Sequence, residues 1–162
     1  MAQKIKVQKE WSFYQTYHDS AYILRHDCSK DIPLREIGEK RTYRLFNKSE
    51  KEIIVYQVDG GLISVDDVSK CDYAIYTEDD WLYLIELKGA DLEHALEQIN
   101  STINTLLKRP NIKVKKLNVR IVLSKVRVPN SLETKEKKLK HLLQTYGGGN
   151  YIKQSRILED SI

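Results

Sequence analysis

The clearest pattern along the chain is helical and lies near its middle. Apolar residues recur there at the i, i+3, i+4, i+7 spacing that places side chains on one face of an α-helix. They are Leu92, Ala95, Leu96, Ile99, Ile103, Leu106 and Leu107. Pro110 ends this predicted helix, because proline lacks the backbone N–H that a helix needs. A second helix is predicted from about Leu132 to Tyr146, before three glycines.

Runs of β-branched and aromatic residues predict strands on the N-terminal side of the first helix. The runs 43–46 and 53–58 are separated by a polar turn and predict a β-hairpin. The runs 71–76 and 81–88 are separated by a charged turn and predict a second antiparallel pair. Four strands in meander order are therefore expected here.

Weaker patterns surround these segments. Ser29 or Asp31 followed by Pro33 is typical of a helix start, and it predicts a short helix through about Lys40. Residues 117–123 predict a buried strand, since nearly all of them are apolar. No clean period assigns the first 28 residues to helix or strand.

A last strand is expected around residues 151–158, so helices and strands alternate through the second half of the chain. This order predicts an α/β fold with a mixed β-sheet flanked by helices, in an α-β-α sandwich. A length of 162 residues favours one domain spanning residues 1–162.

Charge is unevenly distributed along the chain. The formal net charge of +4 is too small to establish a nucleic-acid partner by itself. Residues 31–98 hold 16 acidic against 8 basic side chains, whereas residues 105–141 hold 12 basic against 2 acidic ones. The first stretch could hold a cation and the second a polyanion, although a solvated basic face has the same composition.

Composition also argues against some classes of protein. No run approaches the roughly 18 apolar residues of a membrane-spanning helix, so a soluble protein without a membrane partner is expected. Cys28 and Cys71 are too few and too far apart for a zinc site. The N-terminus has no secretory apolar segment, so reduced thiols and a cytoplasmic location are expected.

The candidate chemistry lies at the end of the 81–88 strand. Side chains alternate along a strand, so Glu86 and Lys88 share one face. In an antiparallel pair with its turn near Asp79, Asp72 comes to lie opposite the end of that strand. Two carboxylates facing each other repel, and a divalent cation that prefers oxygen ligands removes the conflict. An ion pair at a sheet edge in an unrelated fold is the alternative.

The same residues carry a resemblance to a known family. Asp72, the sequence Glu-Leu-Lys at 86–88 and Gln98 on the following helix resemble the PD-(D/E)XK nuclease superfamily, which has the restriction-endonuclease-like fold. The similar stretch covers residues 58–107, under a third of the chain. Cys71 stands where the family name has proline, at a position that varies widely.

The resemblance implies Mg²⁺-dependent or Mn²⁺-dependent hydrolysis of DNA phosphodiester bonds. It implies that Asp72 and Glu86 are metal ligands, that Lys88 is the catalytic lysine and that Gln98 belongs to the active site. Lys88 could position or deprotonate the attacking water, or it could stabilise developing negative charge. A further acidic residue is common in the family, and the sequence offers three candidates without choosing among them: Glu36, Glu39 and Asp59.

DNA is the expected partner, and basic residues after the predicted helix are candidate phosphate contacts. They are Lys108, Arg109, Lys113, Lys115 and Lys116. The resemblance also makes a homodimer possible, for which exposed apolar aromatics near the N-terminus could serve. Two other functions stay open: a catalytically inactive nucleic-acid-binding or scaffold subunit on the same fold, and a protein-interaction domain with no nucleic-acid role.

Overall fold

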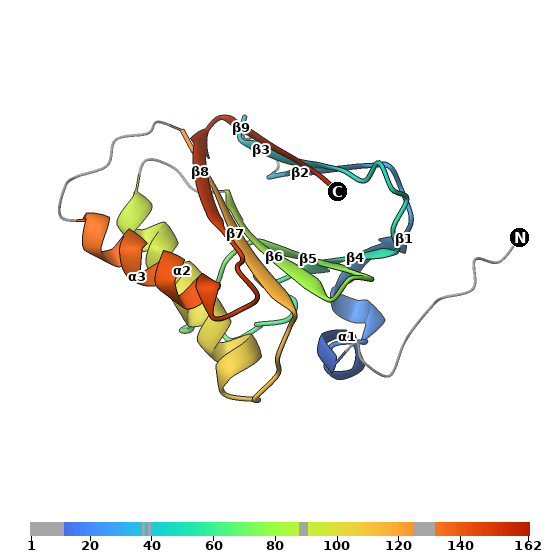
Figure 1. Cartoon of the computed structure of the whole chain (residues 1–162), viewed down its shortest axis with the longest axis horizontal. Helices are drawn as coiled ribbons and strands as arrows, with labels where there is room; N and C mark the ends of the chain where they lie inside the picture. The colour runs from blue at the N-terminus through green and yellow to red at the C-terminus, as the bar shows by residue number, and fades with distance from the viewer. Residues whose placement is uncertain (1–11, 37, 39, 88–90, 125–131) are drawn as a thin grey trace, which may run out of the picture.

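The computed structural model describes residues 12–36, 38, 40–87, 91–124 and 132–162. Within this part of the chain, one sheet has six strands in the order β1-β4-β5-β6-β7-β8, and a second has three in the order β2-β3-β9 (Figure 1). The strands are β1 (Ile23–Asp27), β2 (Asp31–Arg35), β3 (Thr42–Phe46), β4 (Ile53–Gln57), β5 (Tyr73–Thr77), β6 (Trp81–Leu87), β7 (Lys116–Leu123), β8 (Tyr151–Ser155) and β9 (Ile157–Ser161).

The helices are fewer than the strands. They are α1 (Ser12–Thr16), a 3-10 turn (Ser20–Tyr22), α2 (Leu92–Ile103) with a π-helical continuation (Asn104–Lys108), and α3 (Glu133–Gln144). Both predicted long helices are therefore confirmed, with ends within two residues of those expected. No helix in the described ranges is long and apolar enough to cross a membrane.

The elements form three layers, with the six-stranded sheet in the middle (Figure 1). Helices α2 and α3 cover one of its faces, and the three-stranded sheet covers the other. The predicted α/β fold with a mixed sheet is confirmed, because β5 and β6 are antiparallel while β6, β7 and β8 are parallel. The predicted sandwich with helical layers on both sides is corrected, since a second sheet takes the place of one helical layer.

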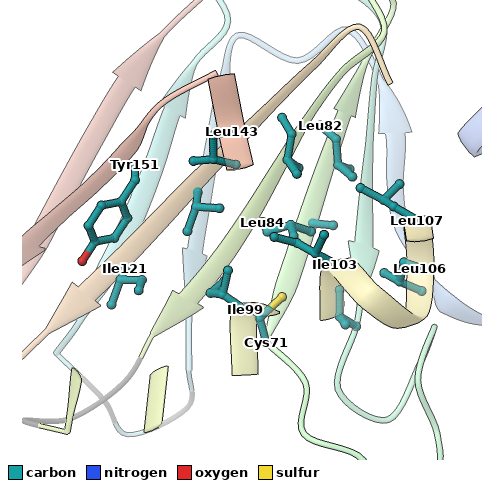
Figure 2. Packing of buried hydrophobic residues seen from close by; sticks show 14 of the residues in the cluster. Cys71, Leu82, Leu84, Ile99, Ile103, Leu106, Leu107, Ile121, Leu143 and Tyr151 are labelled. Atoms are coloured by element: carbon teal, nitrogen blue, oxygen red, sulfur yellow. The ribbon is translucent and has the colours of Figure 1, made fainter. Parts of the chain in front are cut away.

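The centre of the molecule is built around β6 and α2. Leu82 and Leu84 of β6 face Ile99 and Ile103 of α2 across the apolar core (Figure 2). These side chains are at most 1% exposed, so α2 is fixed against the sheet by apolar burial, the main stabilising contribution in such cores. The antiparallel pairing of β5 with β6, predicted from the sequence, is confirmed by the register Tyr73 with Ile85.

The helix predicted to run through about Lys40 is wrong, because residues 31–35 form strand β2. Exposed Asp31, Pro33 and Arg35 alternate there with buried Ile32 and Leu34, which is the period of a strand. Strand β2 is at the edge of its sheet, where the missing N–H of Pro33 removes no necessary hydrogen bond. The alternation of exposed and buried residues over 31–35 therefore decides the structure of this segment, and the helix-start pattern does not.

The hairpin predicted for 43–46 and 53–58 is also wrong, because β3 and β4 lie in different sheets. The turn between them is built around Asn47, whose side chain accepts from Lys51 N at 3.0 Å and donates to Lys51 O and Ser29 O. The chain therefore passes from one sheet to the other where the sequence shows only a polar turn.

The last predicted strand, 151–158, is divided in two. Arg156 separates β8 from β9 with a φ of 66°, in the left-handed region that non-glycine residues seldom adopt. Strand β8 stays in the main sheet, and β9 pairs in parallel with β3 of the second sheet.

The aromatic residues near the N-terminus belong to the core of this chain. Phe13 is fully buried, and its ring contacts those of Tyr17, Tyr56 and Tyr76 at centroid distances of 4.8 to 5.4 Å. The expectation of exposed N-terminal aromatics is therefore wrong for Phe13. Phe13 therefore cannot belong to the exposed surface that was expected to support a dimer, and Trp11 lies outside the described residues.

Candidate functional site

Asp72 and Glu86 face each other at the C-terminal end of β6. The antiparallel register that pairs Tyr73 with Ile85 places Asp72 opposite Glu86, one residue beyond it. Asp72 N donates to Ile85 O at 3.2 Å, and Leu87 N donates to Asp72 Oδ2 at 2.8 Å. The Glu86 side chain interacts with the Asp72 carboxyl group and lowers its pKa, against the larger effect of burial, which raises it.

Glu86 is buried, with 1% of its surface exposed, on a strand that is otherwise apolar or aromatic. Placing a charged carboxylate there costs free energy unless a partner or a cation offsets it. The neighbouring Cys71 does not supply that offset. Burial and the negative charge of Glu86 raise the pKa of its thiol well above the ordinary value, so Cys71 packs as a neutral side chain.

Two further carboxylates add negative charge around Asp72. Burial is the largest cause that raises the pKa of Asp72, and the charges of Glu36 and Asp59 raise it further. The hydrogen bonds from Leu87 N and with Glu86 act in the opposite direction. Of the three candidates for an additional acidic residue, the structure brings Glu36 and Asp59 toward the pair, while Glu39 lies outside the described residues.

Glu36 approaches from the second sheet, just beyond the end of β2. Its side chain forms a hydrogen bond with Tyr73, the first residue of β5. Burial, followed by the charge and hydrogen bond of Glu36, raises the pKa of Tyr73 to about 12, so the phenol keeps its proton and donates it. Tyr73 thereby holds Glu36 beside the strand that Asp72 precedes.

Gln98 reaches the same region from helix α2. Its side-chain Nε2 donates to Lys70 O at 3.0 Å, two residues before Asp72. Thr102, one turn further along the helix, accepts from Cys71 N at 2.9 Å and donates to Gln98 O at 2.7 Å. Together these contacts fix α2 to the segment that carries Asp72.

A small open cavity lies between α2 and the loop that follows β4. It has a volume of about 240 Å³, and its lining includes Gln98, His94, Lys70, Asp59 and Asp66. Gln98 Oε1 is buried and accepts no hydrogen bond within the described ranges. An acceptor so placed is available to a water molecule or to a donor on a ligand.

Sequence reasoning did not identify Thr102 or Lys70 as parts of this region. Thr102 did give a signal, because it is a polar residue on the apolar face of α2 and is fully buried. Lys70 gave none. Its ammonium group donates to Val65 O at 2.6 Å and lies 3.9 Å from Asp59 Oδ1, contacts that depend on how the loop folds.

The donors that the site offers suit a hard divalent cation. Mg²⁺ is typically held by one or two carboxylates, with water and substrate phosphate oxygens completing its coordination, and Asp72 with Glu86 provides such a pair. Among the described residues, no group of three or more His, Cys, Asp or Glu side chains is arranged to hold a metal ion. Lys88, the predicted catalytic lysine, lies outside the described residues.

The structure does not bring the predicted phosphate contacts to this site. Lys116 pairs with Trp81 at the start of β6, and its Nζ lies 4.2 Å from the centre of the indole ring. Five residues separate Trp81 from Glu86, about 17 Å at roughly 3.3 Å per strand residue. The set Lys108, Arg109, Lys113, Lys115 and Lys116 occupies the π-helical turn, the loop after it and the start of β7.

Comparison of the chain with protein-family models, with curated proteins and with solved structures finds no match in any of the three.

Proposed function

We propose that this protein is a metal-dependent nuclease with a restriction-endonuclease-like fold, which hydrolyses phosphodiester bonds in DNA. The observation that carries the proposal is the pair Asp72 and Glu86, held face to face at the end of β6 with Glu36 and Asp59 nearby. Crowded carboxylates with a raised pKa are characteristic of functional sites, because they do not stabilise the fold by themselves.

Asp72 and Glu86 hold the cation in this proposal. A bound Mg²⁺ or Mn²⁺ supplies polarisation of a phosphoryl oxygen and lowers the pKa of a bound water. The backbone N–H of Leu87 orients the Asp72 carboxylate by donating to Oδ2 at 2.8 Å. Glu36 and Asp59 add negative charge that favours cation binding.

Lys88 and Gln98 complete the proposed active site. The resemblance assigns Lys88 to the attacking water or to the charge that develops on phosphorus. Gln98 is a positioning residue, because its amide bonds the chain two residues before Asp72. Gln98 also lines the adjoining cavity, and its carbonyl oxygen accepts no hydrogen bond within the described residues.

A cleavage assay with matched variants tests the proposal. Supercoiled, linear and single-stranded DNA are incubated with the protein in Mg²⁺, in Mn²⁺ and in chelator, beside Glu86→Gln and Lys88→Ala. Glu97→Gln, on the exposed side of α2, makes the same chemical change outside the site. We expect metal-dependent cleavage by the wild type and by Glu97→Gln, and none by the other two.

Two results would contradict the proposal. Cleavage that persists in both Glu86→Gln and Lys88→Ala would place the activity elsewhere or in a contaminant. DNA binding without cleavage on any substrate, and without a calorimetric signal for Mn²⁺, would favour a catalytically inactive binding or scaffold subunit. A homodimer is proposed from the resemblance alone, and sedimentation velocity decides it.

A further inference from the structure

A second cavity is lined by basic side chains and opens to solvent. Its volume is about 480 Å³. The described residues that line it are Gly38, Lys40, Arg41, Ser124 and Arg156. All of them except the half-buried Arg41 are exposed, so a ligand can enter from bulk water. A volume of this size is within the usual range for small-molecule or nucleotide sites.

This cavity is lined by residues where β7 ends and where β8 turns into β9, at the end of the main sheet where β6 also ends. Strand β7 runs parallel to β6 with Val122 opposite Leu87, so Ser124 lies where β6 ends. On the other side of the cavity, Gly38 follows Glu36 by two residues, and the charge of Glu36 acts on Asp72. The basic cavity and the acidic site therefore lie at the same end of the main sheet.

The turn that carries Arg156 is held by hydrogen bonds to both sheets. Arg156 N donates to Leu123 O at 2.8 Å, at the end of β7, and Arg156 O accepts from Thr42 N at 2.9 Å, at the start of β3. Its φ of 66° lies in the left-handed region that an arginine seldom adopts. Arg156 thus occupies a fixed position between the layers.

The charges in the cavity have one sign. Three of the lining residues are cationic, and no described lining residue is acidic. Within the described part of the chain, Lys40 and Arg156 form no ion pair, whereas Arg44 pairs with Asp31 and Arg120 with Asp160 on neighbouring strands. Cations left without a carboxylate next to an acidic site indicate an anionic ligand.

We propose that this cavity binds a backbone phosphate of the nucleic acid, beside the phosphate that is cleaved; this rests on the proposed function. A site rich in carboxylates repels a polyanion, so nearby cations are needed to hold the backbone against it. The guanidinium group of Arg156 suits phosphate oxygens, which it can contact with two N–H donors. The contact is sequence-independent and sets the register of the strand.

DNA binding by a charge-matched pair of variants tests the assignment. In a Glu86→Gln background, which prevents cleavage, Lys40→Ala with Arg156→Ala is compared with Lys48→Ala with Lys138→Ala. The second pair removes the same charge from exposed positions away from the cavity. Fluorescence anisotropy with a 20-base-pair duplex is recorded over a range of salt concentrations.

We expect the cavity pair to weaken DNA binding roughly 10-fold or more and to lower the salt slope by about one. The control pair should change affinity less than about 3-fold. Arg156→Lys alone should retain most of the affinity, which separates loss of charge from loss of the turn. Circular dichroism melting of each variant shows that the comparison is made on folded protein.

The outcomes separate this inference from the proposed function. Equal weakening by both pairs, with metal-dependent cleavage by the wild type intact, overturns the phosphate cavity alone. Absence of both DNA binding and cleavage in the wild type overturns both. NMR titration with inorganic phosphate distinguishes the source: shifts at Gly38 and Ser124 with phosphate but none with DNA would also overturn the backbone assignment.

Discussion

The two ends of strand β6 differ in how their charged side chains are paired. At its start, Lys51 pairs with Asp79, and the ammonium groups of Lys51 and Lys116 lie 5.6 and 4.2 Å from the centre of the Trp81 ring. Asp80 accepts from the Tyr76 hydroxyl and from Lys115 N. Each of these charges meets a partner of opposite sign, a polar group or an aromatic ring, as in an ordinary stabilising surface.

At the other end of β6, carboxylates gather around Asp72. Asp72, Glu86, Glu36 and Asp59 approach one another, and the pKa of Asp72 rises because of burial and of the last two. The number of charged residues is similar in kind at both ends, whereas their pairing distinguishes the end that stabilises the fold from the end that is proposed to be functional.

The largest difference between the two ends should appear when one carboxylate at each end is neutralised. Asp72→Asn should lower the rate of DNA cleavage by roughly 1,000-fold or more, because it removes a proposed metal ligand. Asp79→Asn should change the rate less than about 2-fold. Single-turnover assays at saturating Mg²⁺ measure both, and a similar loss in the two variants would remove the functional distinction between the ends.

Mn²⁺ should stabilise the protein through the acidic end alone. At a concentration about 100 times its dissociation constant, a ligand of the folded state adds about 2.7 kcal/mol to the free energy of unfolding. The gain should grow with pH, because burial raises the pKa of Asp72 and a proton there competes with the metal ion. Thermal melts at several pH values measure it, and an undiminished gain in Glu86→Gln would exclude this site.

Without metal, Asp72→Asn should make the protein more stable. The folded-state pKa of Asp72 lies above its ordinary value of 3.8, so the folded state binds more protons than the unfolded one between those values. Wild-type stability therefore falls as pH rises through the folded pKa, and the variant escapes this loss. We expect a gain of roughly 0.5–2 kcal/mol at neutral pH in urea unfolding, and little difference below pH 3.8. If Asp72→Asn were less stable than the wild type at neutral pH, the claim that burial and nearby carboxylates disfavour the ionised Asp72 would be contradicted.

The smallest effect should come from the start of β6. Lys116→Ala removes the cation above Trp81 and should lower the free energy of unfolding by roughly 0.5–1 kcal/mol, while cleavage is unchanged. Lys116→Arg is the matched control that retains the charge and the stacking. A substantial loss of DNA affinity in Lys116→Ala would restore the basic segment as a phosphate contact.

Local patterns were sufficient for the parts of the fold that local physics decides. Helix α2, strand β7 and the β5–β6 pair follow from apolar periodicity, and the pair in turn places Asp72 opposite Glu86. The sheet to which a strand belongs is a long-range property. The sequence therefore did not separate β3 from β4, or β8 from β9.

The same limit applied to the candidate site. Glu36 reaches Asp72 from the second sheet, a placement that depends on β2 being a strand rather than the predicted helix. Lys40 and Arg156 are 116 positions apart and meet only because β9 pairs with β3. Charge clustering along the chain instead pointed to residues 108–116, which lie at the opposite end of the sheet.

The parallel pairing of β9 with β3 also orders events during synthesis. Strand β9 supplies Leu158 to the core between the sheets, and its Asp160 joins Tyr43 of β3 to Arg120 of β7. None of these contacts can form before residues 157–161 have left the ribosome. Main-sheet strands can pair earlier, but the sheet that leads to Glu36 stays incomplete until then. A nascent chain would thus bring Glu36 into place beside Asp72 only after β9 has been synthesised.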